Sequence, residues 1–210
     1  MTTPLTTTKA RHRRWLMPVA CWLVALAAAH ALDHWVWSWA TLGKDVERRD
    51  WWQFLRAIGY LGTWAGLALA IELARTSLSP RPRNLPGLAA FVSAILAGSL
   101  AEALKFVIGR GRPSDTGTYI WHGLFAPLEV GNRGIPSSHA AVAFGGMFAL
   151  AAAFPRATPI FMALAIGCGA SRILSGAHFF SDTVAGAALG ALAACLVRPL
   201  SVDRRGGRPA

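Results

Sequence analysis

Charged residues are scarce in this chain, and acidic residues are scarcer than basic ones. Asp, Glu, Lys and Arg make up 15% of its 210 residues, whereas soluble domains contain about a quarter. Ten residues are acidic and 21 are basic, which gives a formal net charge of +11. Such an excess is found in nucleic-acid-binding proteins, but here the bases fall in short clusters between long apolar runs. We therefore expect a membrane protein with anionic partners and no nucleic acid.

Cysteine is also rare and does not indicate a disulfide framework or a metal site. Cys21, Cys168 and Cys195 all lie within apolar runs, and none of them has metal-ligand spacing. An odd number of cysteines cannot pair completely. We expect all three side chains to be buried as small hydrophobic groups.

Apolar runs, by contrast, fill most of the chain: hydrophobic residues make up 54% of it, and the mean hydropathy is +0.41. A membrane-spanning helix needs about 20 mostly apolar residues. Six segments approach this length: 15–32, 57–74, 85–101 with a helical continuation to 108, 140–154, 157–174 and 179–197. The sequence predicts an all-α bundle of six transmembrane helices over residues 15–198. A basic cytoplasmic segment, 1–14, precedes it, and a disordered cytoplasmic tail, 199–210, follows it.

The distribution of Lys and Arg predicts the orientation of the bundle, because loops rich in these residues stay in the cytoplasm. Bases without neighbouring acids precede the first span and follow the second, fourth and sixth. They are Lys9, Arg11, Arg13, Arg14, Arg75, Arg81, Arg83, Arg156, Arg198, Arg204, Arg205 and Arg208. In the opposite loops, bases alternate with acids. Both termini should therefore face the cytoplasm, and the long loop 109–136 should face outside.

The first span has a second interpretation. It follows a basic segment and ends near Ala29-His30-Ala31, a sequence that resembles a signal-peptidase site. The apolar stretch is long for a signal peptide, and the bulky Trp15 and Trp22 suit a retained helix. Cleavage would leave the later spans in the same orientation, so both alternatives predict the same outer face.

Three polar clusters lie at the ends of the predicted spans, all on the outer side. They are Lys105 with Arg112-Pro113 after six residues, Pro136-Ser137-Ser138-His139, and Ser171-Arg172 with His178 after five residues and Asp182 after three more. Charges at a membrane edge are costly unless they are paired or functional. One phosphate group would satisfy Lys105, Arg112 and Arg172 together, because guanidinium groups bind phosphate in bidentate fashion.

The second and third clusters contain residues suited to reacting with such a phosphate. His178 and Asp182 are four residues apart and share a face on a helix. The carboxylate can accept the Nδ1 proton, which leaves Nε2 free and more nucleophilic. Pro136 and Ser137 favour the start of a helix, whose free N–H groups attract an anion. His139 would then lie in the first turn, within reach of the phosphate.

These clusters resemble the three-part signature of the type 2 phosphatidic acid phosphatase superfamily, which includes lipid phosphate phosphatases and vanadium haloperoxidases. The family pattern is Lys-six-Arg-Pro, then Pro-Ser-Gly-His, then Ser-Arg-five-His-three-Asp. The first and third parts match at every specified position, and the second differs once, with Ser138 where glycine is usual. The motifs cover residues 105–182, and the six-span layout extends the resemblance to the bacterial membrane-bound branch over nearly the whole chain.

The resemblance implies a role for each residue of the site. His178 is the nucleophile that forms a phosphohistidine, and Asp182 orients it. His139 protonates the leaving oxygen and then activates water. The residues expected to bind the phosphoryl oxygens are Lys105, Arg112, Ser137, Ser138 (mainly through its backbone) and Arg172. Neither a metal nor another cofactor is expected, because the cations stabilise the transferred phosphoryl group.

The implied function is hydrolysis of a phosphorylated lipid at the periplasmic face of a bacterial inner membrane. Candidate substrates are undecaprenyl pyrophosphate, phosphatidylglycerol phosphate, phosphatidate and lipid A phosphates. A lipid-to-lipid phosphotransferase would use the same residues. A haloperoxidase fits a membrane-embedded chain less well, and a non-catalytic binding or transport protein would not require intact motifs.

Other residues carry weaker expectations. Glu102 lies three residues before Lys105, and we expect an ion pair that fixes the lysine. Glu72 lies near the cytoplasmic end of its span and is expected to reach the interface. In the outer loop, three residues are candidates for substrate contact, namely Asp115, His122 and Arg133. Arg110 is expected to be a solvated loop charge.

The first outer loop contains two further patterns. Five tryptophans predict either an interfacial belt or a surface helix that guides a lipid toward the site. They are Trp35, Trp37, Trp39, Trp51 and Trp52. His30, Asp33 and His34 share helical spacing, which fits a metal site or an interfacial hydrogen-bond cluster. The hydrogen-bond cluster is the favoured interpretation.

Overall fold

The computed structural model describes residues 6–78, 84–125 and 132–201. Within these ranges the regular elements are α1 (Thr6–Ala40), η1 (Lys44–Arg48), α2 (Asp50–Ala57), α3 (Leu61–Leu78), α4 (Pro86–Ile108), α5 (Ser138–Ala153), η2 (Pro155–Ala157), α6 (Thr158–Leu174) and α7 (Phe180–Ser201). The described residues contain no strand, and their β-type pairing is limited to two isolated bridges in the loop after α4. The predicted all-α class is therefore confirmed.

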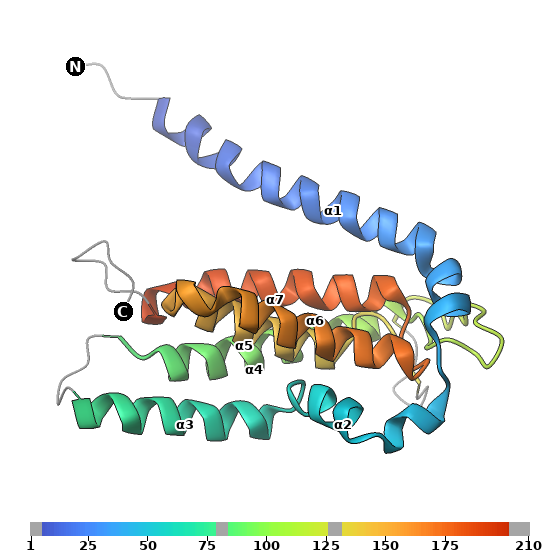
Figure 1. Ribbon diagram of the computed structural model, residues 1–210. Helices are drawn as coiled ribbons and strands as arrows, with labels where there is room; N and C mark the ends of the chain where they lie inside the picture. The colour runs from blue at the N-terminus through green and yellow to red at the C-terminus, as the bar shows by residue number, and fades with distance from the viewer. Residues whose placement is uncertain (1–5, 79–83, 126–131, 202–210) are drawn as a thin grey trace.

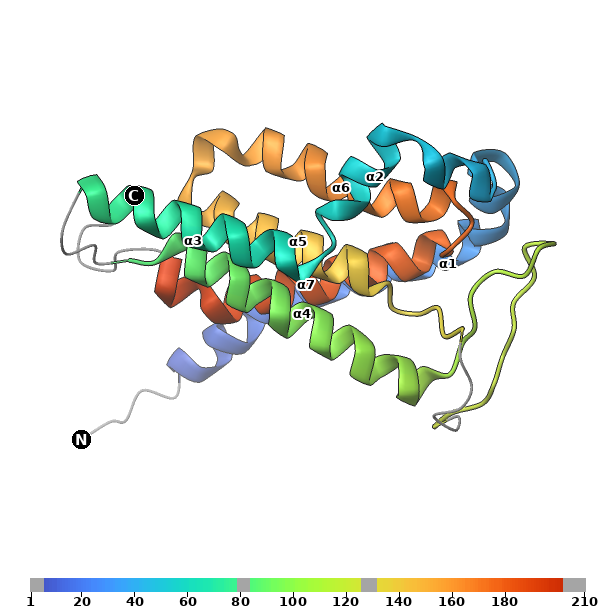
Figure 2. The same ribbon diagram turned by 90° about the horizontal axis from the view of Figure 1, so that it is seen from below.

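Helix α5 forms the centre of the bundle and packs against α4, α6 and α7 (Figures 1 and 2). Helix α3 covers α4, and α1 contacts α7 near its own C-terminal end and diverges from the bundle toward its N-terminal end. The long loop after α4 lies at the same end of the bundle as α2 and the start of α7 (Figure 2). This end carries the residues singled out in the sequence.

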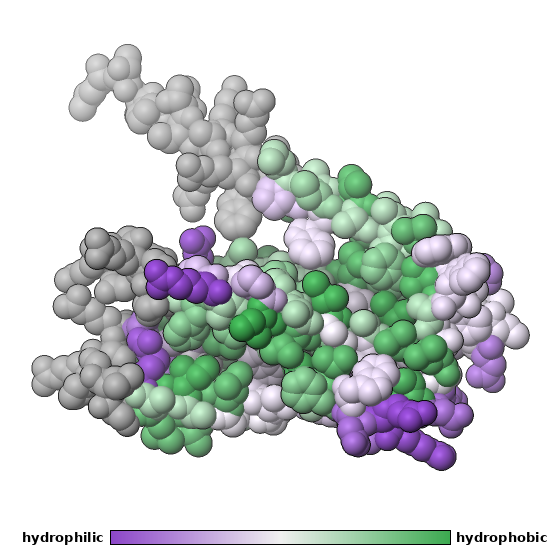
Figure 3. All heavy atoms as spheres, viewed as in Figure 1, coloured by the Kyte–Doolittle hydropathy of each residue, from purple (hydrophilic) through white to green (hydrophobic). Residues whose placement is uncertain are grey.

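Some of the described helices have the length and composition of membrane spans. Four of them qualify over Met17–Ala40, Pro86–Ile108, Pro155–Leu174 and Phe180–Arg198. Helices α2 and α3 together form a fifth candidate, bent by 69°, whereas α5 is apolar but has only 16 residues. Figure 3 shows hydrophobic residues across the middle of the visible face and hydrophilic residues toward its two ends. All six segments predicted as spans are thus helical, and four or five of them meet the criteria for crossing a membrane.

Glycines allow the central helices to approach closely. A Cβ atom at Gly190 of α7 would lie 2.6 Å from the backbone nitrogen of Gly145 in α5. A Cβ at Gly186 would lie 2.6 Å from the carbonyl oxygen of Ser137. Small residues at such crossings are typical of helix packing in membranes. The start of α5 is consequently held against α7, and the Ser137 N–H donates to the backbone oxygen of Asp182 at 2.9 Å.

Glu72, which was expected to reach the interface at the cytoplasmic end of its span, caps α4. Its Oε1 atom accepts hydrogen bonds from the backbone N–H groups of Gly87 (2.7 Å) and Leu88 (3.1 Å). These groups lie in the first turn of α4, where no intrahelical partner exists, and the preceding Leu85 has no capping side chain. A carboxylate there also interacts favourably with the helix dipole.

Two other expectations about burial were partly wrong. Cys168 is buried, but Cys21 and Cys195 lie on helix faces turned away from the protein core and are exposed.

Among the tryptophans of the first outer loop, Trp35, Trp39 and Trp51 are exposed, as an interfacial belt requires. Trp52 is instead fully buried, because α2 packs against α6 and its indole donates to the backbone oxygen of Ser171 at 2.7 Å. Of the predicted flanking segments, 1–14 contains the start of α1 at Thr6, and 199–210, expected to be disordered, contains the end of α7 at Ser201. Residues 1–5 and 202–210 lie outside the described residues, as do the loop residues 79–83 and 126–131.

Candidate active site

The three polar clusters of the sequence meet at one end of the bundle. Helices α4 and α6 end there, and α5 and α7 begin there (Figures 1 and 2). All eight predicted site residues are among those described: Lys105, Arg112, Ser137, Ser138, His139, Arg172, His178 and Asp182. Segments far apart in the sequence therefore bring these eight residues to the same end of the bundle.

His178 and Asp182 form a buried pair. The His178 Nδ1 atom lies 3.2 Å from Asp182 Oδ2, and the two residues are 1% and 0% exposed. An ionised carboxylate can only accept hydrogen bonds, so Nδ1 is the protonated nitrogen and Nε2 carries the free lone pair. The same Oδ2 atom accepts the Phe179 N–H at 3.0 Å, and the His178 N–H donates to the backbone oxygen of Arg172 at 3.2 Å. The ring is thus fixed from both α6 and α7.

The surroundings of His178 favour its neutral form. Burial lowers the pKa of His178 below its ordinary value, and the positive charges of Arg112 and Arg172 lower it further. The bond and the charge of Asp182 act in the opposite direction without reversing the shift. A neutral ring is the form that can act as a nucleophile.

Lys105 connects the first cluster to the second. Its Nζ atom donates to the Ser138 hydroxyl at 2.9 Å and forms a 2.7 Å ion pair with Glu102, which confirms the predicted pair. Helix α5 begins at Ser138 with Ser137 as its N-cap residue, as predicted. The Ser137 hydroxyl makes no capping bond. Within the described part of the chain, neither this buried hydroxyl nor the buried Nε2 of His139 has a hydrogen-bond partner.

Arg112 and Arg172 line a cavity of about 880 Å³ together with Arg56 and Ser175. Three of their buried guanidinium nitrogens lack hydrogen-bond partners among the described residues: Arg112 Nε, Arg172 Nε and Arg172 Nη1. The Arg172 guanidinium lies 5.5 Å from the centre of the Trp52 ring, which helps to hold it in place. Donors with no protein partner are suited to binding an anion.

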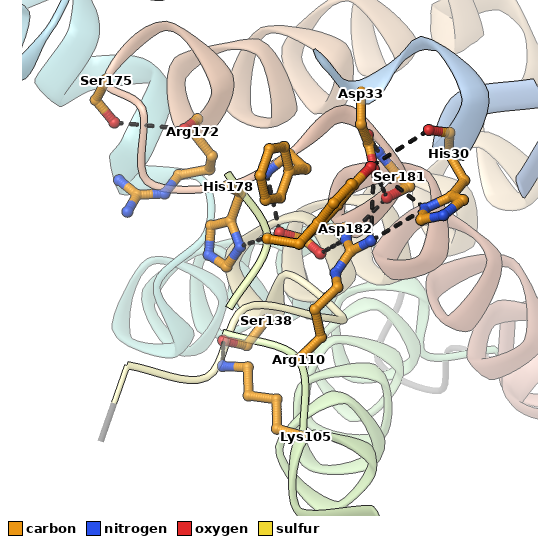
Figure 4. Close-up of polar contacts among 12 residues, drawn as sticks. His30, Asp33, Lys105, Arg110, Ser138, Arg172, Ser175, His178, Ser181 and Asp182 are labelled. Carbon is orange, nitrogen blue, oxygen red and sulfur yellow. Dashed lines mark hydrogen bonds and ion pairs between the residues drawn. The ribbon is translucent and has the colours of Figure 1, made fainter. Parts of the chain in front are cut away.

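Ser138 and His139 line a second cavity of about 540 Å³, together with Tyr60 and Glu102. The His139 ring contacts Tyr60 edge-on, with ring centres 5.1 Å apart. In Figure 4, His178 is drawn between Arg172 on one side and the Lys105–Ser138 pair on the other. Arg112 and Arg172 thus line one cavity and His139 lines another, and the buried His178 and Asp182 belong to the lining of neither.

Arg110 is the residue that sequence reasoning misjudged. The expected solvated charge is 5% exposed, and its Nη2 atom donates to Asp182 Oδ1 and, at 2.8 Å, to the Ser181 hydroxyl. Its Nη1 atom lies 3.4 Å from Asp33 Oδ2, and Asp33 is fully buried. The favoured hydrogen-bond cluster is confirmed for Asp33 and His30, whose Nδ1 atom lies 3.4 Å from Asp33 Oδ2, but the exposed His34 is not among its contacts. Asp33 directly follows the predicted span 15–32, and an acid at a membrane edge is costly unless it is paired or functional. This signal pointed to a cationic partner without identifying Arg110.

Other residues of the outer loop lie around the site. Asp115 lines the larger cavity. Arg133 instead packs over Phe106, with its guanidinium carbon 4.4 Å from the ring centre. His122 lies close to Gly111, in the segment that follows α4. The structure thus brings only Asp115, of the three candidates for substrate contact, to the wall of a described cavity.

Comparison with known proteins relates this arrangement to a family. The model of the PAP2 superfamily matches residues 86–205. Lipid A 1-phosphatase of Rhizobium johnstonii is 38% identical over 103 residues, which are 48% of this chain and 42% of that protein. Its Rhizobium etli counterpart is 36% identical over 104 residues, 48% of this chain and 44% of that protein. The match thus spans less than half the length of these curated relatives.

Two solved structures share the fold. The first transmembrane PAP2 type phosphatidylglycerolphosphate phosphatase from Bacillus subtilis aligns with a TM-score of 0.65 and 22% identity, over 92% of this chain and 98% of that one. Aquifex aeolicus LpxE aligns with a TM-score of 0.50 and 20% identity, over 70% and 82% of the respective chains. With the family model matching more than half of the residues and the motif residues meeting at one end of the bundle, the chain belongs to the PAP2 superfamily.

Proposed function

We propose that this protein is a membrane lipid phosphatase that hydrolyses a phosphate monoester or diphosphate through a phosphohistidine on His178. The observation that carries the proposal is the buried His178–Asp182 pair, whose Nδ1 to Oδ2 distance is 3.2 Å, next to arginine and serine donors without protein partners. A neutral, oriented imidazole supplies the nucleophile, and the free donors supply the binding site for the phosphoryl oxygens.

In the first step, His178 Nε2 attacks phosphorus while Asp182 accepts the hydrogen bond from Nδ1–H. A P–N bond forms and the bond from phosphorus to the lipid oxygen breaks. Burial and the charge of Arg172 lower the pKa of His139 to about 3 in the free site, so the ring must take up its proton together with the negatively charged phosphate, which favours the charged imidazolium. His139 then donates that proton to the leaving oxygen, and the lipid leaves as an alcohol or as a shorter phosphate. Lys105, Arg112 and Arg172 offset the charge on the phosphoryl oxygens, with additional donors from Ser137 and the N–H groups at the start of α5.

In the second step, water replaces the imidazole. His139, now neutral, takes a proton from the attacking water. The new P–O bond forms as the P–N bond breaks, and inorganic phosphate leaves. His178 returns to its neutral form with the Nδ1 proton still directed at Asp182. One histidine therefore serves as acid and then as base, and the other carries the phosphoryl group.

Phosphate release is expected to proceed without a divalent cation. Among the described residues, no group of three or more His, Cys, Asp or Glu side chains is placed to hold a metal ion, and three cations surround the proposed phosphate site. If a metal ion were required, its removal would cost several kcal/mol of transition-state stabilisation and most of the activity. We expect instead that EDTA changes the rate of phosphate release by less than about twofold. The test is phosphate release by the purified chain in EDTA, with His178→Ala as the blank. Loss of activity in EDTA and its return with Mg²⁺ would contradict the mechanism.

The substrate proposed first is a lipid A phosphate, because the curated relatives with the reported identities are lipid A 1-phosphatases. Phosphatidylglycerol phosphate, phosphatidate and undecaprenyl pyrophosphate form the rest of the test panel. Each is offered to the purified protein in detergent, and free phosphate is measured. Release from none of them would contradict the proposed function, and phosphate recovered on an added lipid acceptor would instead identify a phosphotransferase.

We further propose six membrane crossings in a bacterial inner membrane, with the site on the periplasmic face. Arg75 and Arg198 occur in the last turns of α3 and α7, and Arg156 lies between α5 and α6. All three positions are at the end of the bundle opposite the site, which supports a cytoplasmic location for that end.

This orientation predicts opposite labelling at the two ends of the bundle. Thr116 and Arg156 are both exposed and lie at the site end and the other end, respectively. In a cysteine-free background, Thr116→Cys should react with a membrane-impermeant maleimide in cells with a permeabilised outer membrane. Arg156→Cys should react only after the inner membrane is lysed. The reverse pattern would overturn the proposed orientation.

A further inference from the structure

We propose that Arg110 and Asp33 are positioning residues for the reaction: Asp33 on α1 holds Arg110, Arg110 holds Asp182, and Asp182 holds His178. The inference rests on the proposed function and extends it to residues outside the three motifs. It also gives α1 a role in organising the site. Figure 4 shows the chain of contacts from His30 and Asp33 through Arg110 to His178.

The first link is the carboxylate of Asp182, whose two oxygens have different partners. Oδ2 lies 3.2 Å from His178 Nδ1 and accepts the Phe179 N–H, whereas Oδ1 accepts from Arg110 Nη2. A carboxylate bound only through Oδ2 can rotate about its terminal bond, which is a soft torsion. With Arg110 on Oδ1, rotation would break a charge-assisted bond in a buried site. Arg110 thus keeps Oδ2 directed at the histidine.

The second link is the guanidinium of Arg110, which is held on its faces and its edge. Its central carbon lies 5.3 Å from the ring centres of both Tyr119 and Phe179. Along its edge, it donates to Ser181 as well as Asp182 and approaches Asp33. The side chain is only 6% exposed. A planar cation fixed in this way can orient a partner, which a flexible ammonium group does less well.

The third link is Asp33, which connects α1 to the start of α7. Its Oδ1 atom accepts the Ser181 N–H at 2.7 Å, and its Oδ2 atom accepts the Ser181 hydroxyl and, at 3.0 Å, the Tyr119 hydroxyl. Burial, followed by the charge of Asp33, raises the pKa of Tyr119 to about 12, so the phenol remains a donor. A fully buried carboxylate requires such partners. Asp33 therefore holds Arg110 through Nη1, while the adjacent Nη2 atom bonds to Asp182.

The charges of this group also suit the proposed chemistry. As ionised groups, two carboxylates and one guanidinium leave one excess negative charge behind His178. The imidazole ring becomes positively charged when Nε2 bonds to phosphorus, and a negative charge placed in advance stabilises that change. Arg110 moderates the charge of the two acids while it fixes their geometry. It bonds to Asp182, on the Nδ1 side of His178, and so acts through Asp182 and not through the phosphate.

The proposal predicts a loss in kcat with little change in KM. Arg110→Gln should lower kcat about 10- to 100-fold, the range found for residues that orient a ligating or reacting histidine, while KM stays within about threefold. Asp33→Asn should also lower kcat. Arg110→Lys should lower kcat less than Arg110→Gln does, because lysine keeps the positive charge. Exposed residues of η1 supply matched controls, Arg48→Gln and Asp45→Asn, which should leave both constants unchanged.

Two further measurements separate positioning from a general structural effect. If Arg110 acts through Asp182, then Arg110→Gln in an Asp182→Asn background should change kcat by less than about threefold, although it is costly in the wild-type chain. Independently of activity, ¹⁵N-histidine NMR of the detergent-solubilised chain should show His178 protonated at Nδ1. That tautomer should become mixed in Arg110→Gln, while Arg48→Gln leaves it unchanged.

The assay uses dioctanoyl phosphatidate and whichever panel lipid the wild-type protein hydrolyses fastest. A raised KM with unchanged kcat would show that Arg110 contacts substrate, and an undiminished loss in the Asp182→Asn background would show that it does not act through Asp182. Either result, or an unchanged His178 tautomer, would overturn the inference. A wild-type protein that releases no phosphate from any lipid would instead contradict the proposed function, and the tautomer measurement would still decide the positioning role.

Discussion

Replacement of His178 by alanine is expected to remove phosphate release almost completely, with kcat lowered by about 10⁴-fold or more, as when other enzymes lose their nucleophile. The ring supplies the only bond through which the proposed intermediate forms, and the donors around the phosphate site cannot replace it. The measurement is initial-rate phosphate release by the purified variant. His34→Ala is the matched control, because His34 is an exposed histidine on α1.

A residual rate within tenfold of the wild-type value would contradict the assignment of His178 as nucleophile. A lower thermal unfolding midpoint in His178→Ala would not explain a complete loss of activity. Asp182→Asn is the second variant to be compared with the wild-type protein. It retains the size of the buried side chain but weakens control of the imidazole tautomer. We expect it to lower kcat strongly, by about 10²- to 10⁴-fold, with the upper figure taken from the equivalent change in a serine protease triad.

Replacement of His139 is expected to slow both chemical steps, but unequally for different leaving groups. In His139→Ala, the first step lacks its acid and the second its base, so kcat for a lipid alcohol should fall about 10²- to 10⁴-fold. An activated aryl phosphate needs little protonation and should phosphorylate His178 at a nearly normal rate. Phosphoenzyme should then accumulate, because water attack still lacks a base. The measurement is the burst amplitude with p-nitrophenyl phosphate.

A variant without a burst, in which the activated ester and the lipid lose rate equally, would contradict this division of roles. His34→Ala is again the matched control, because His34 is exposed on α1 and belongs to none of the three motifs. It should show the same rate and burst as the wild-type protein.

The parts of the account that are local in sequence could be predicted. Apolar runs locate the six long helices, and the i, i+4 spacing of His178 and Asp182 predicts their contact. Pro136 and Ser137 predict the start of α5, because the start of a helix depends on a few adjacent residues. The Glu102–Lys105 ion pair, at i, i+3, was predictable on equal grounds.

Contacts between distant segments could not be predicted in this way. Asp33 and Arg110 are separated by 77 positions, and no spacing rule joins a helix to a loop so far away. Nothing in the residues near Arg110 in the sequence identifies Asp33 or Asp182 as its partners, and a solvated loop charge was expected instead. Trp52 is a similar case, because its burial results from the packing of α2 on α6 and not from its own neighbours in the chain.

The central claim is that the phosphoryl group is carried on His178, and rapid acid quenching tests it most directly. The purified His139→Ala protein is mixed with a ³²P-labelled aryl phosphate, quenched within the burst, and digested for peptide mapping. The proposed mechanism predicts an acid-labile, alkali-stable adduct on His178 that is absent from the His139→Ala/His178→Ala double variant. An adduct on another residue, or one that persists when His178 is replaced, would contradict it.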